Sequence, residues 1–235
     1  EKDRLHALFS DLVGLRHQVA LNTGFASFAD YKFEVLGRFD YNRQDCYAIH
    51  EAIERVVKPQ LIARSRERQA HLGLPDLRHW DLTVDEFGKE PLHPFQDSKE
   101  LIAGSIRVLQ HLGPSLADKL RIMEQMGHLD LESRMGKAPG GYNYSLPETG
   151  VPFIFMNAVG TQSDLTTMLH EAGHAQHSFA TQYIDISEFK HMPAEIAELA
   201  SMSLELLTLD YLGEFYKDPE DLRRARREQL MRPLT

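Results

Sequence analysis

Two histidines four residues apart, His170 and His174, constrain this chain more than any other feature of its sequence. On an α-helix, positions four apart lie on one face, so both imidazoles can reach a single metal ion. Glu171 follows His170 directly, where its carboxylate can act as a general base toward water. His-Glu-x-x-His is a zinc-binding signature, and the alternative is a pair of buried structural histidines.

The residues around this pair predict a helix that follows a strand. Thr161 to Asp164 has the form of a capping box, a hydroxyl followed three residues later by an acid. Apolar residues then recur at helical spacing: Leu165, Met168, Leu169, Ala172 and Ala175. Upstream, Val151 to Val159 is an apolar run between two glycines, which is typical of a strand that could place a peptide backbone beside a metal. Tyr142, Asn157 and Ala158 are candidate substrate contacts, although packing is the favoured interpretation of Tyr142.

A catalytic zinc takes three protein ligands and leaves one position open for water. A third histidine six residues after His174 is excluded, because position 180 is alanine. His177 lies one turn beyond His174 on the same helix and could at most support the ligands from a second shell. His191 is a further candidate downstream.

The better source of a third ligand is the helix predicted from Ala194 to Glu205. Glu195, Glu198 and Glu205 recur there at helical spacing among apolar and small residues. Carboxylates on a largely apolar helix are costly unless they are paired or metal-bound. Glu198 is far enough from His174 for the chain to turn and run back, and Glu195, one turn earlier, is its rival.

Ligand histidines usually donate their other ring N–H to a carboxylate or carbonyl. Glu205 lies two turns beyond Glu198 on nearly the same helix face, and we favour it as the partner of one histidine. Asp164, which precedes His170 on its helix, is a second candidate. The alternative for Glu205 is a surface or salt-bridged acid.

The segment from His170 to His177 resembles the extended HExGHxxH motif of the thimet oligopeptidase and oligoendopeptidase F family. The resemblance extends in the family's order over nearly the whole chain, through the segments 15–18, 37–41, 78–82, 136–140 and 197–205. It implies one Zn²⁺ per chain, held by His170, His174 and Glu198, with Glu171 as the general base. It also implies oligopeptide substrates, because a deep channel in this family excludes folded proteins.

Composition restricts the partners and the compartment. The net charge of −9 disfavours nucleic acid and anionic membranes as partners. Cys46 is the only cysteine, which excludes an intramolecular disulfide and fits a reducing compartment. No apolar run is long enough to span a bilayer. We therefore predict a cytoplasmic protein, with an oligomeric state that the sequence does not specify.

Helical patterns dominate the rest of the chain. A long helix is predicted from Arg43 to Leu72, stopping at Gly73, with a kink or a break at Pro59. The segment Asp76 to Val84 is predicted to be extended. Further helices are predicted to begin at Asp97, Pro114 and Asp218.

We predict a mainly α-helical, zincin-type metallopeptidase core with a small antiparallel sheet beside the zinc helix, in which residues 1–235 form one catalytic domain. Family members are longer, and we expect their N-terminal region and their C-terminal tail, which carries histidine and tyrosine donors, to be absent here. Apolar surface is expected around Leu204, Leu207 and Tyr211 as a result. The predicted function is zinc-dependent endoproteolysis of short peptides. The alternatives are a catalytically impaired zinc- or peptide-binding module and a zinc hydrolase acting on another substrate.

Overall fold

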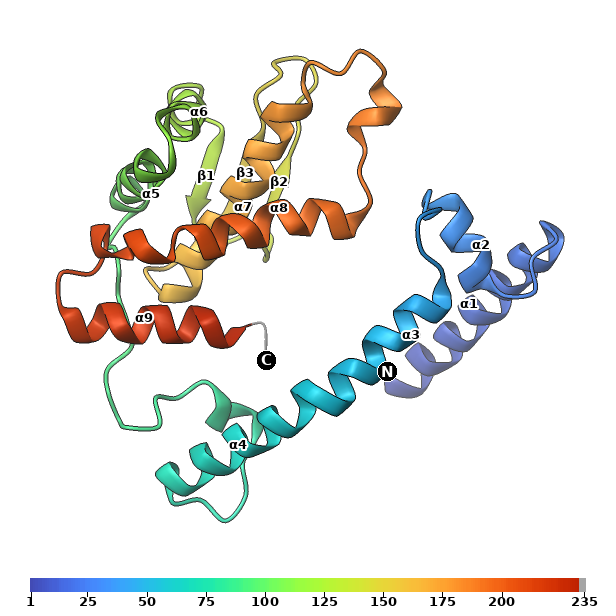
Figure 1. Cartoon of the computed structure of the whole chain (residues 1–235), viewed down its shortest axis with the longest axis horizontal. Helices are drawn as coiled ribbons and strands as arrows, with labels where there is room; N and C mark the ends of the chain where they lie inside the picture. The colour runs from blue at the N-terminus through green and yellow to red at the C-terminus, as the bar shows by residue number, and fades with distance from the viewer. Residues whose placement is uncertain (233–235) are drawn as a thin grey trace. The chain divides into compact units, whose positions relative to one another are not determined.

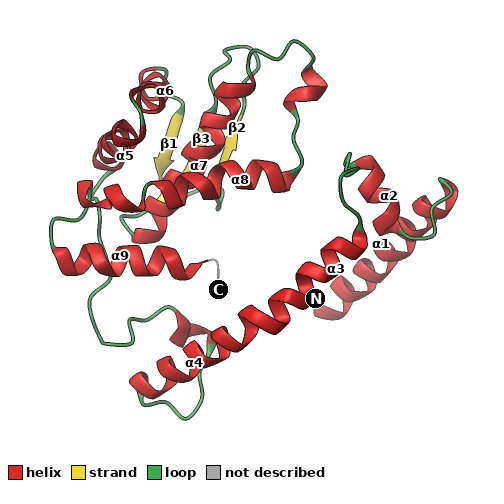
Figure 2. Ribbon diagram, in the orientation of Figure 1, coloured by secondary structure: helices red, strands yellow, loops and turns green. Residues whose placement is uncertain are grey.

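The computed structural model describes residues 1–232, which are mostly helical (Figures 1 and 2). The chain divides into two compact units, one of residues 1–67 and one that starts at Arg68. Among the described residues, no helix is both long enough and apolar enough to cross a membrane. The assignment of residues 1–235 to one catalytic domain stays a prediction.

The first unit is built from helices, and two of them, α2 and α3, begin at polar caps. Its elements are α1 (Lys2–Asn22), α2 (Phe28–Val35), α3 (Arg43–Ala52) and the first part of α4 (Lys58–Leu72). The Ser27 hydroxyl accepts a hydrogen bond from the Asp30 backbone N–H at the start of α2. Asn42 and Asp45 form a capping box at the start of α3. Such caps satisfy backbone N–H groups that have no partner inside the helix.

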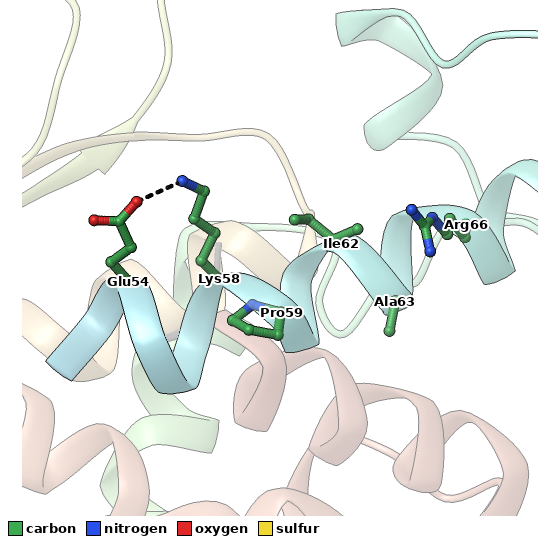
Figure 3. Close-up of a pocket in the computed structure, with 6 residues that line it drawn as sticks. All are labelled: Glu54, Lys58, Pro59, Ile62, Ala63 and Arg66. Atoms are coloured by element: carbon green, nitrogen blue, oxygen red, sulfur yellow. Dashed lines mark hydrogen bonds and ion pairs between the residues drawn. The ribbon is translucent and has the colours of Figure 1, made fainter. Parts of the chain in front are cut away.

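The helical run from α3 to α4 passes through a π-helical turn, Ile53–Val57, which ends two residues before Pro59. Figure 3 shows Glu54, Lys58 and Pro59 along this run. Proline lacks the backbone N–H and clashes with the carbonyl four residues earlier, and a widened turn relieves both problems. Glu54 and Lys58 form an ion pair of 2.8 Å across this turn, beside a shallow hollow of about 420 Å³. The run ends before Gly73, whose φ of 65° favours glycine. A kink or a break was predicted at Pro59; the helical run continues through this residue without a break, and the irregularity is the π-helical turn before it.

The second unit contains a three-stranded sheet covered by helices. Its strands are β1 (Leu129–Glu132), β2 (Tyr142–Tyr144) and β3 (Phe153–Ala158), in the order β1-β3-β2. Ile154 of β3 pairs with Leu129 of β1 in parallel and with Asn143 of β2 in antiparallel fashion. The predicted small sheet is confirmed, but it is mixed rather than purely antiparallel. The chain reverses direction between β1 and β2, and β3 lies between these two strands in the sheet.

The helices of the second unit confirm the predicted starts. They are α5 (Ser98–Leu112), α6 (Pro114–Gln125), α7 (Gln162–Thr181), α8 (Ala194–Leu207) and α9 (Pro219–Met231). Three short 3-10 helices accompany them: η2 (His79–Leu82), η3 (Ser187–Lys190) and η4 (Leu209–Glu214). The prediction of an extended segment from Asp76 to Val84 was wrong, because the Asp81 carboxylate accepts the Arg78 backbone N–H at 2.7 Å and closes the η2 turn instead.

The core of the second unit forms where α7 packs on the sheet. All five apolar residues that predicted the α7 stripe are buried, and β3 alternates between buried and half-buried positions. The apolar surface expected around Leu204, Leu207 and Tyr211 is only partly present: Leu207 is exposed, whereas Leu204 is buried and Tyr211 packs against the core. Tyr211 stacks on His111 with ring centres 4.8 Å apart.

Lys137 ties the loop after β1 to that strand. Its Nζ donates to the carbonyls of Asp130 and Glu132 and to Asp130 Oδ1, at 2.8–3.0 Å, so that all three ammonium hydrogens are used. The Lys137 side chain is 1% exposed. Arg134 reaches the same carboxylate from the solvent side, and the hydrogen bonds from Arg134 and Lys137 lower the pKa of Asp130 to about 2.

We predict that the buried Lys137 contributes more to the free energy of unfolding than the exposed Arg134, although both bond the Asp130 carboxylate. Lys137→Met should lower the free energy of unfolding by about 3 kcal/mol, because it leaves a carboxylate and two carbonyls without their buried donor. Arg134→Met removes an exposed partner and should cost less than about 1 kcal/mol. Urea unfolding of both variants measures the difference, and equal losses would contradict the prediction.

Candidate metal centre

Helix α7 presents His170 and His174 on one face. The capping box of Thr161 and Asp164 fixes where the helix begins, and the two imidazole rings lie with centres 4.8 Å apart at nearly right angles. The Asp164 carboxylate is engaged in this cap, where it accepts the backbone N–H groups of Val159 and Thr161 at 2.9 Å. Asp164 therefore holds the start of the helix, and nothing in the described residues supports its predicted contact with a histidine.

Helix α8 packs unusually close to α7 at Gly173. A β-carbon built on Gly173 would lie 2.6 Å from Ser201 Cα and 3.0 Å from the Ala200 carbonyl oxygen. No side chain can share this space with the α8 backbone. The absence of a side chain at Gly173 thus lets α8 cross directly over the histidine pair, as the crossing of α7 and α8 in Figure 1 shows.

This crossing brings the Glu198 carboxylate to both histidines. Glu198 Oε2 lies 3.3 Å from His170 Nε2, and Glu198 Oε1 lies 3.8 Å from His174 Nε2. The three ligand atoms lie within 4.8 Å of one another, and the predicted rival Glu195 is not part of the group. Zinc–ligand bonds of about 2.1 Å in a tetrahedral arrangement place ligand atoms about 3.4 Å apart, which these separations approach.

Ser201 helps to hold the Glu198 side chain. Its hydroxyl is completely buried and lies 3.0 Å from both the Glu198 carbonyl oxygen and Glu198 Oε2. A hydroxyl has one hydrogen to donate, so it can bond either oxygen in turn. Ser201 is therefore small enough to allow the close helix contact, and its hydroxyl also holds the Glu198 carboxylate.

Glu205 contacts the other side of the His170 ring. Its Oε1 lies 2.6 Å from His170 Nδ1, and it raises the pKa of His170 through that hydrogen bond. A hydrogen on Nδ1 leaves Nε2 as the free lone pair of a neutral ring, facing Glu198. Burial alone would raise the pKa of Glu205, but His170, Arg232 and Gln229 together lower it.

The pKa values of His174 and Glu171 are shifted in opposite directions. Burial, together with the charge of His170, lowers the pKa of His174, which favours the neutral imidazole that a metal ligand requires. Burial raises the pKa of Glu171, whose carboxylate also accepts the backbone N–H of Asn143 on β2. Glu171 is buried, and no group in the described part of the chain hydrogen-bonds to its Oε2. A buried, partly unpartnered carboxylate next to a histidine pair is suited to accepting a proton.

These groups line one hollow of about 510 Å³. Besides the histidine pair, Glu171 and Glu198, its wall includes Tyr142, Asn143, Ser178, Lys190 and His191. His177, predicted to support the ligands, lines the same hollow. Two predicted substrate contacts do not line it: the Asn157 amide donates to the carbonyls of Ala138 and Gly140, and Ala158 is buried in the core.

Sequence reasoning missed Gly173, Ser201 and Asn143. A glycine inside a strongly helical segment costs about 1 kcal/mol relative to alanine, and this is a signal that the helix surface is used for close packing. The small residues Ala197, Ala200 and Ser201 on α8 carry the matching signal. Nothing in the sequence pointed to Asn143, because its contribution to the site is a backbone N–H.

The whole-chain comparison agrees with the local geometry. The sequence profile described as Peptidase family M3 matches residues 1–234. The chain belongs to peptidase family M3. Its resemblance to oligoendopeptidase F is thereby confirmed at the level of the family, as is the mainly helical fold with a small sheet.

Individual M3 relatives are distant in sequence and close in fold. An oligoendopeptidase F homolog of Lactococcus lactis subsp. lactis (strain IL1403) is 26% identical over 154 residues, which are 66% of this chain and 25% of the relative. The chromosomal oligoendopeptidase F of Lactococcus lactis subsp. cremoris is 32% identical over 114 residues, 48% of this chain and 19% of the relative. The solved structure of PZ peptidase A with inhibitor 2 superposes with a TM-score of 0.89 at 28% identity, covering 99% of this chain and 41% of that one. The chain thus spans about a quarter of the length of the first of these relatives.

We predict that Gly173→Ala destabilises the second unit, against the usual effect of this substitution in helices. Helix propensity alone would stabilise by about 1 kcal/mol, whereas forcing a methyl group against the α8 backbone should cost about 1–3 kcal/mol net. Gly14→Ala in α1 is the control, because a β-carbon there meets nothing within 4 Å. Thermal or urea unfolding should show opposite signs for the two variants, and stabilisation by both would refute the close-packing argument.

Proposed function

We propose that this chain is the zinc-binding catalytic part of an oligopeptidase that hydrolyses internal bonds of short peptides. One observation supports this most directly: His170, His174 and Glu198 converge within 4.8 Å, beside the buried carboxylate of Glu171. Membership of peptidase family M3 supports the peptidase activity, and the hollow next to these groups offers room for a peptide.

The donor set fits zinc rather than a harder cation. Two imidazoles and one carboxylate are the ligands of many catalytic zinc sites, which keep a fourth position open. Calcium and magnesium prefer oxygen ligands alone. The contact between His170 Nδ1 and Glu205 also matches the outer-shell carboxylate that fixes the tautomer of a zinc-bound histidine. We therefore propose one Zn²⁺ per chain.

When bound, zinc supplies a Lewis acid that polarises the scissile carbonyl and acidifies water. Glu171 would accept the proton of the attacking water and transfer it to the leaving amine. The raised pKa of Glu171, caused by burial, brings its proton affinity closer to that needed for both steps. The Asn143 N–H, which bonds to the Glu171 carboxylate, would hold it in place during the transfer.

The peptide would lie in the hollow between β2 and the two helices. Tyr142 lines this hollow and stacks on Phe155 with ring centres 5.0 Å apart, so its ring is held as one wall. We propose Tyr142 as a substrate contact and do not extend this to Asn157 or Ala158. His177 and Glu205 are proposed to support the ligands without binding the metal. The cytoplasmic location, like the absence of nucleic-acid and membrane partners, stays a prediction.

The alternative is a zinc- or peptide-binding module that cleaves slowly or not at all. It shares the proposed metal site and differs only in turnover. The side chains that would donate to the oxyanion of the tetrahedral intermediate decide between the two, since losing one such donor costs about a hundred- to a thousandfold in rate. Hydrolysis of a quenched peptide by the zinc-loaded chain distinguishes the two.

We predict that Glu198 and Glu171 separate into a ligand and a base. Glu198→Ala should weaken zinc binding by more than about a hundredfold, beyond the range of outer-shell changes. Glu171→Gln should leave zinc affinity within about threefold and lower peptide turnover by about a hundred- to ten-thousandfold. Chelator competition measures the zinc affinities, and hydrolysis of a quenched peptide by each zinc-loaded variant measures turnover.

Glu195→Ala is the matched control, because Glu195 lies one turn before Glu198 on the same helix and outside the cluster. It should leave zinc affinity unchanged. Release of zinc by Glu195→Ala but not by Glu198→Ala would show that the third ligand is Glu195, one helical turn earlier. Equal loss of zinc in Glu198→Ala and Glu171→Gln would show that the two roles are misassigned.

A further inference from the structure

We propose that Gln229 on α9 is a positioning residue for the metal centre, acting through Glu205 on His170. The proposal rests on the zinc site proposed above and adds a third layer of residues behind it. Gln229 Nε2 donates to Glu205 Oε2 at 2.5 Å, while Glu205 Oε1 holds His170 Nδ1 at 2.6 Å. Each oxygen of the Glu205 carboxylate therefore has its own partner, one on α9 and one on α7.

The orientation of the Gln229 amide follows from hydrogen-bond chemistry. An ionised carboxylate can only accept, so the NH₂ group of Gln229 must face Glu205 and its oxygen must face the other way. There it meets the Thr166 hydroxyl at 2.7 Å, a group that can donate. A flipped amide would place two acceptors together at Glu205, so Thr166 and Glu205 between them allow one orientation.

The chain of hydrogen bonds continues away from the metal centre. Gln162 Nε2 lies 3.5 Å from the Thr166 hydroxyl, and Gln162 Oε1 accepts from the Tyr216 hydroxyl at 2.5 Å. With the amide oriented as above, every hydrogen in the series from Tyr216 through Gln162, Thr166 and Gln229 can point toward Glu205. Hydrogen bonds aligned in one direction polarise and strengthen one another.

This chain lies inside the protein, where polar groups are expensive. Gln162, Thr166, Gln229 and Tyr216 are 2–7% exposed. Apolar side chains could tie α9 to α7 without the desolvation cost of two amides and two hydroxyls. The Arg232 guanidinium also approaches Glu205 Oε2, at 3.7 Å, but its side chain is 46% exposed and its attraction is weakened by solvent. Gln229 is thus the buried group that defines where the Glu205 carboxylate sits.

The consequence is that α9 influences the metal without supplying a ligand. A carboxylate freed from Gln229 could rotate away from His170 Nδ1, and the imidazole would then lose the partner that fixes its ring and tautomer. Loss of an outer-shell partner of this kind typically weakens metal binding about ten- to a hundredfold. One layer further out, we expect Gln229→Met to weaken zinc binding by about five- to tenfold.

The test is a double-mutant cycle read by zinc affinity. Zinc dissociation constants are measured by chelator competition for the parent chain, Gln229→Met, Glu205→Gln and the double variant. If Gln229 acts through Glu205, Gln229→Met weakens zinc binding in the parent and changes it by less than about twofold in the Glu205→Gln background. An equal effect in both backgrounds, or none in the parent, overturns the proposal.

Gln176→Met is the matched control for a merely structural role. Gln176 lies on α7 two residues after His174, and its Nε2 donates to the Leu116 carbonyl at 3.0 Å, outside the chain that reaches Glu205. It should lose comparable stability and keep parental zinc affinity. If Gln229→Met does not fold, Gln229→Asn replaces it, because the shorter amide keeps the polarity but cannot span the same distance.

The failure of this proposal can be told apart from the failure of the proposed function. A parent chain that binds no zinc contradicts the metal site itself. If the parent chain binds zinc and Gln229→Met binds it equally tightly, the proposed zinc site is supported and the role of Gln229 is rejected.

Discussion

The close contact between α7 and α8 at Gly173 is the constraint on which the site depends. Two histidines on one helix can offer only two ligands, and the third has to come from another element. Because Gly173 has no side chain, the α8 backbone at Ser201 can lie against α7, within reach of the histidine rings. The two oxygens of the Glu198 carboxylate then lie 3.3 Å from His170 Nε2 and 3.8 Å from His174 Nε2.

A second constraint is the separation of the three acids by environment. Glu198 lines the hollow and is half exposed, Glu171 is buried with one oxygen unpartnered, and Glu205 accepts a hydrogen bond on each oxygen. The same side-chain chemistry is thereby suited to three tasks: a ligand that a cation can reach, a base with a raised pKa, and a fixed hydrogen-bond acceptor. Helical spacing alone does not distinguish these tasks, but burial and partners do.

Much of the fold followed from local signals in the sequence. The Thr161 capping box, the apolar stripe of α7 and the turn at Gly73 depend on neighbouring residues, and each was predicted where it occurs. The parallel pairing of β1 with β3 was not, because it depends on how a distant segment inserts. Asp164 was predicted both to cap α7 and to support a histidine, and only the cap is observed. A carboxylate that caps a helix and one that supports a histidine look alike in sequence until the fold shows which N–H is nearest.

We infer that His170, His174 and Glu198 share one zinc ion. Zinc K-edge X-ray absorption of the chain loaded with one equivalent of zinc tests it most directly, because imidazole rings give a recognisable multiple-scattering pattern. We expect two imidazoles and further oxygen ligands, with bonds of about 2.0–2.2 Å, and the loss of one imidazole in His174→Ala. A sulfur ligand, a different number of imidazoles, or a spectrum unchanged by His174→Ala would contradict it.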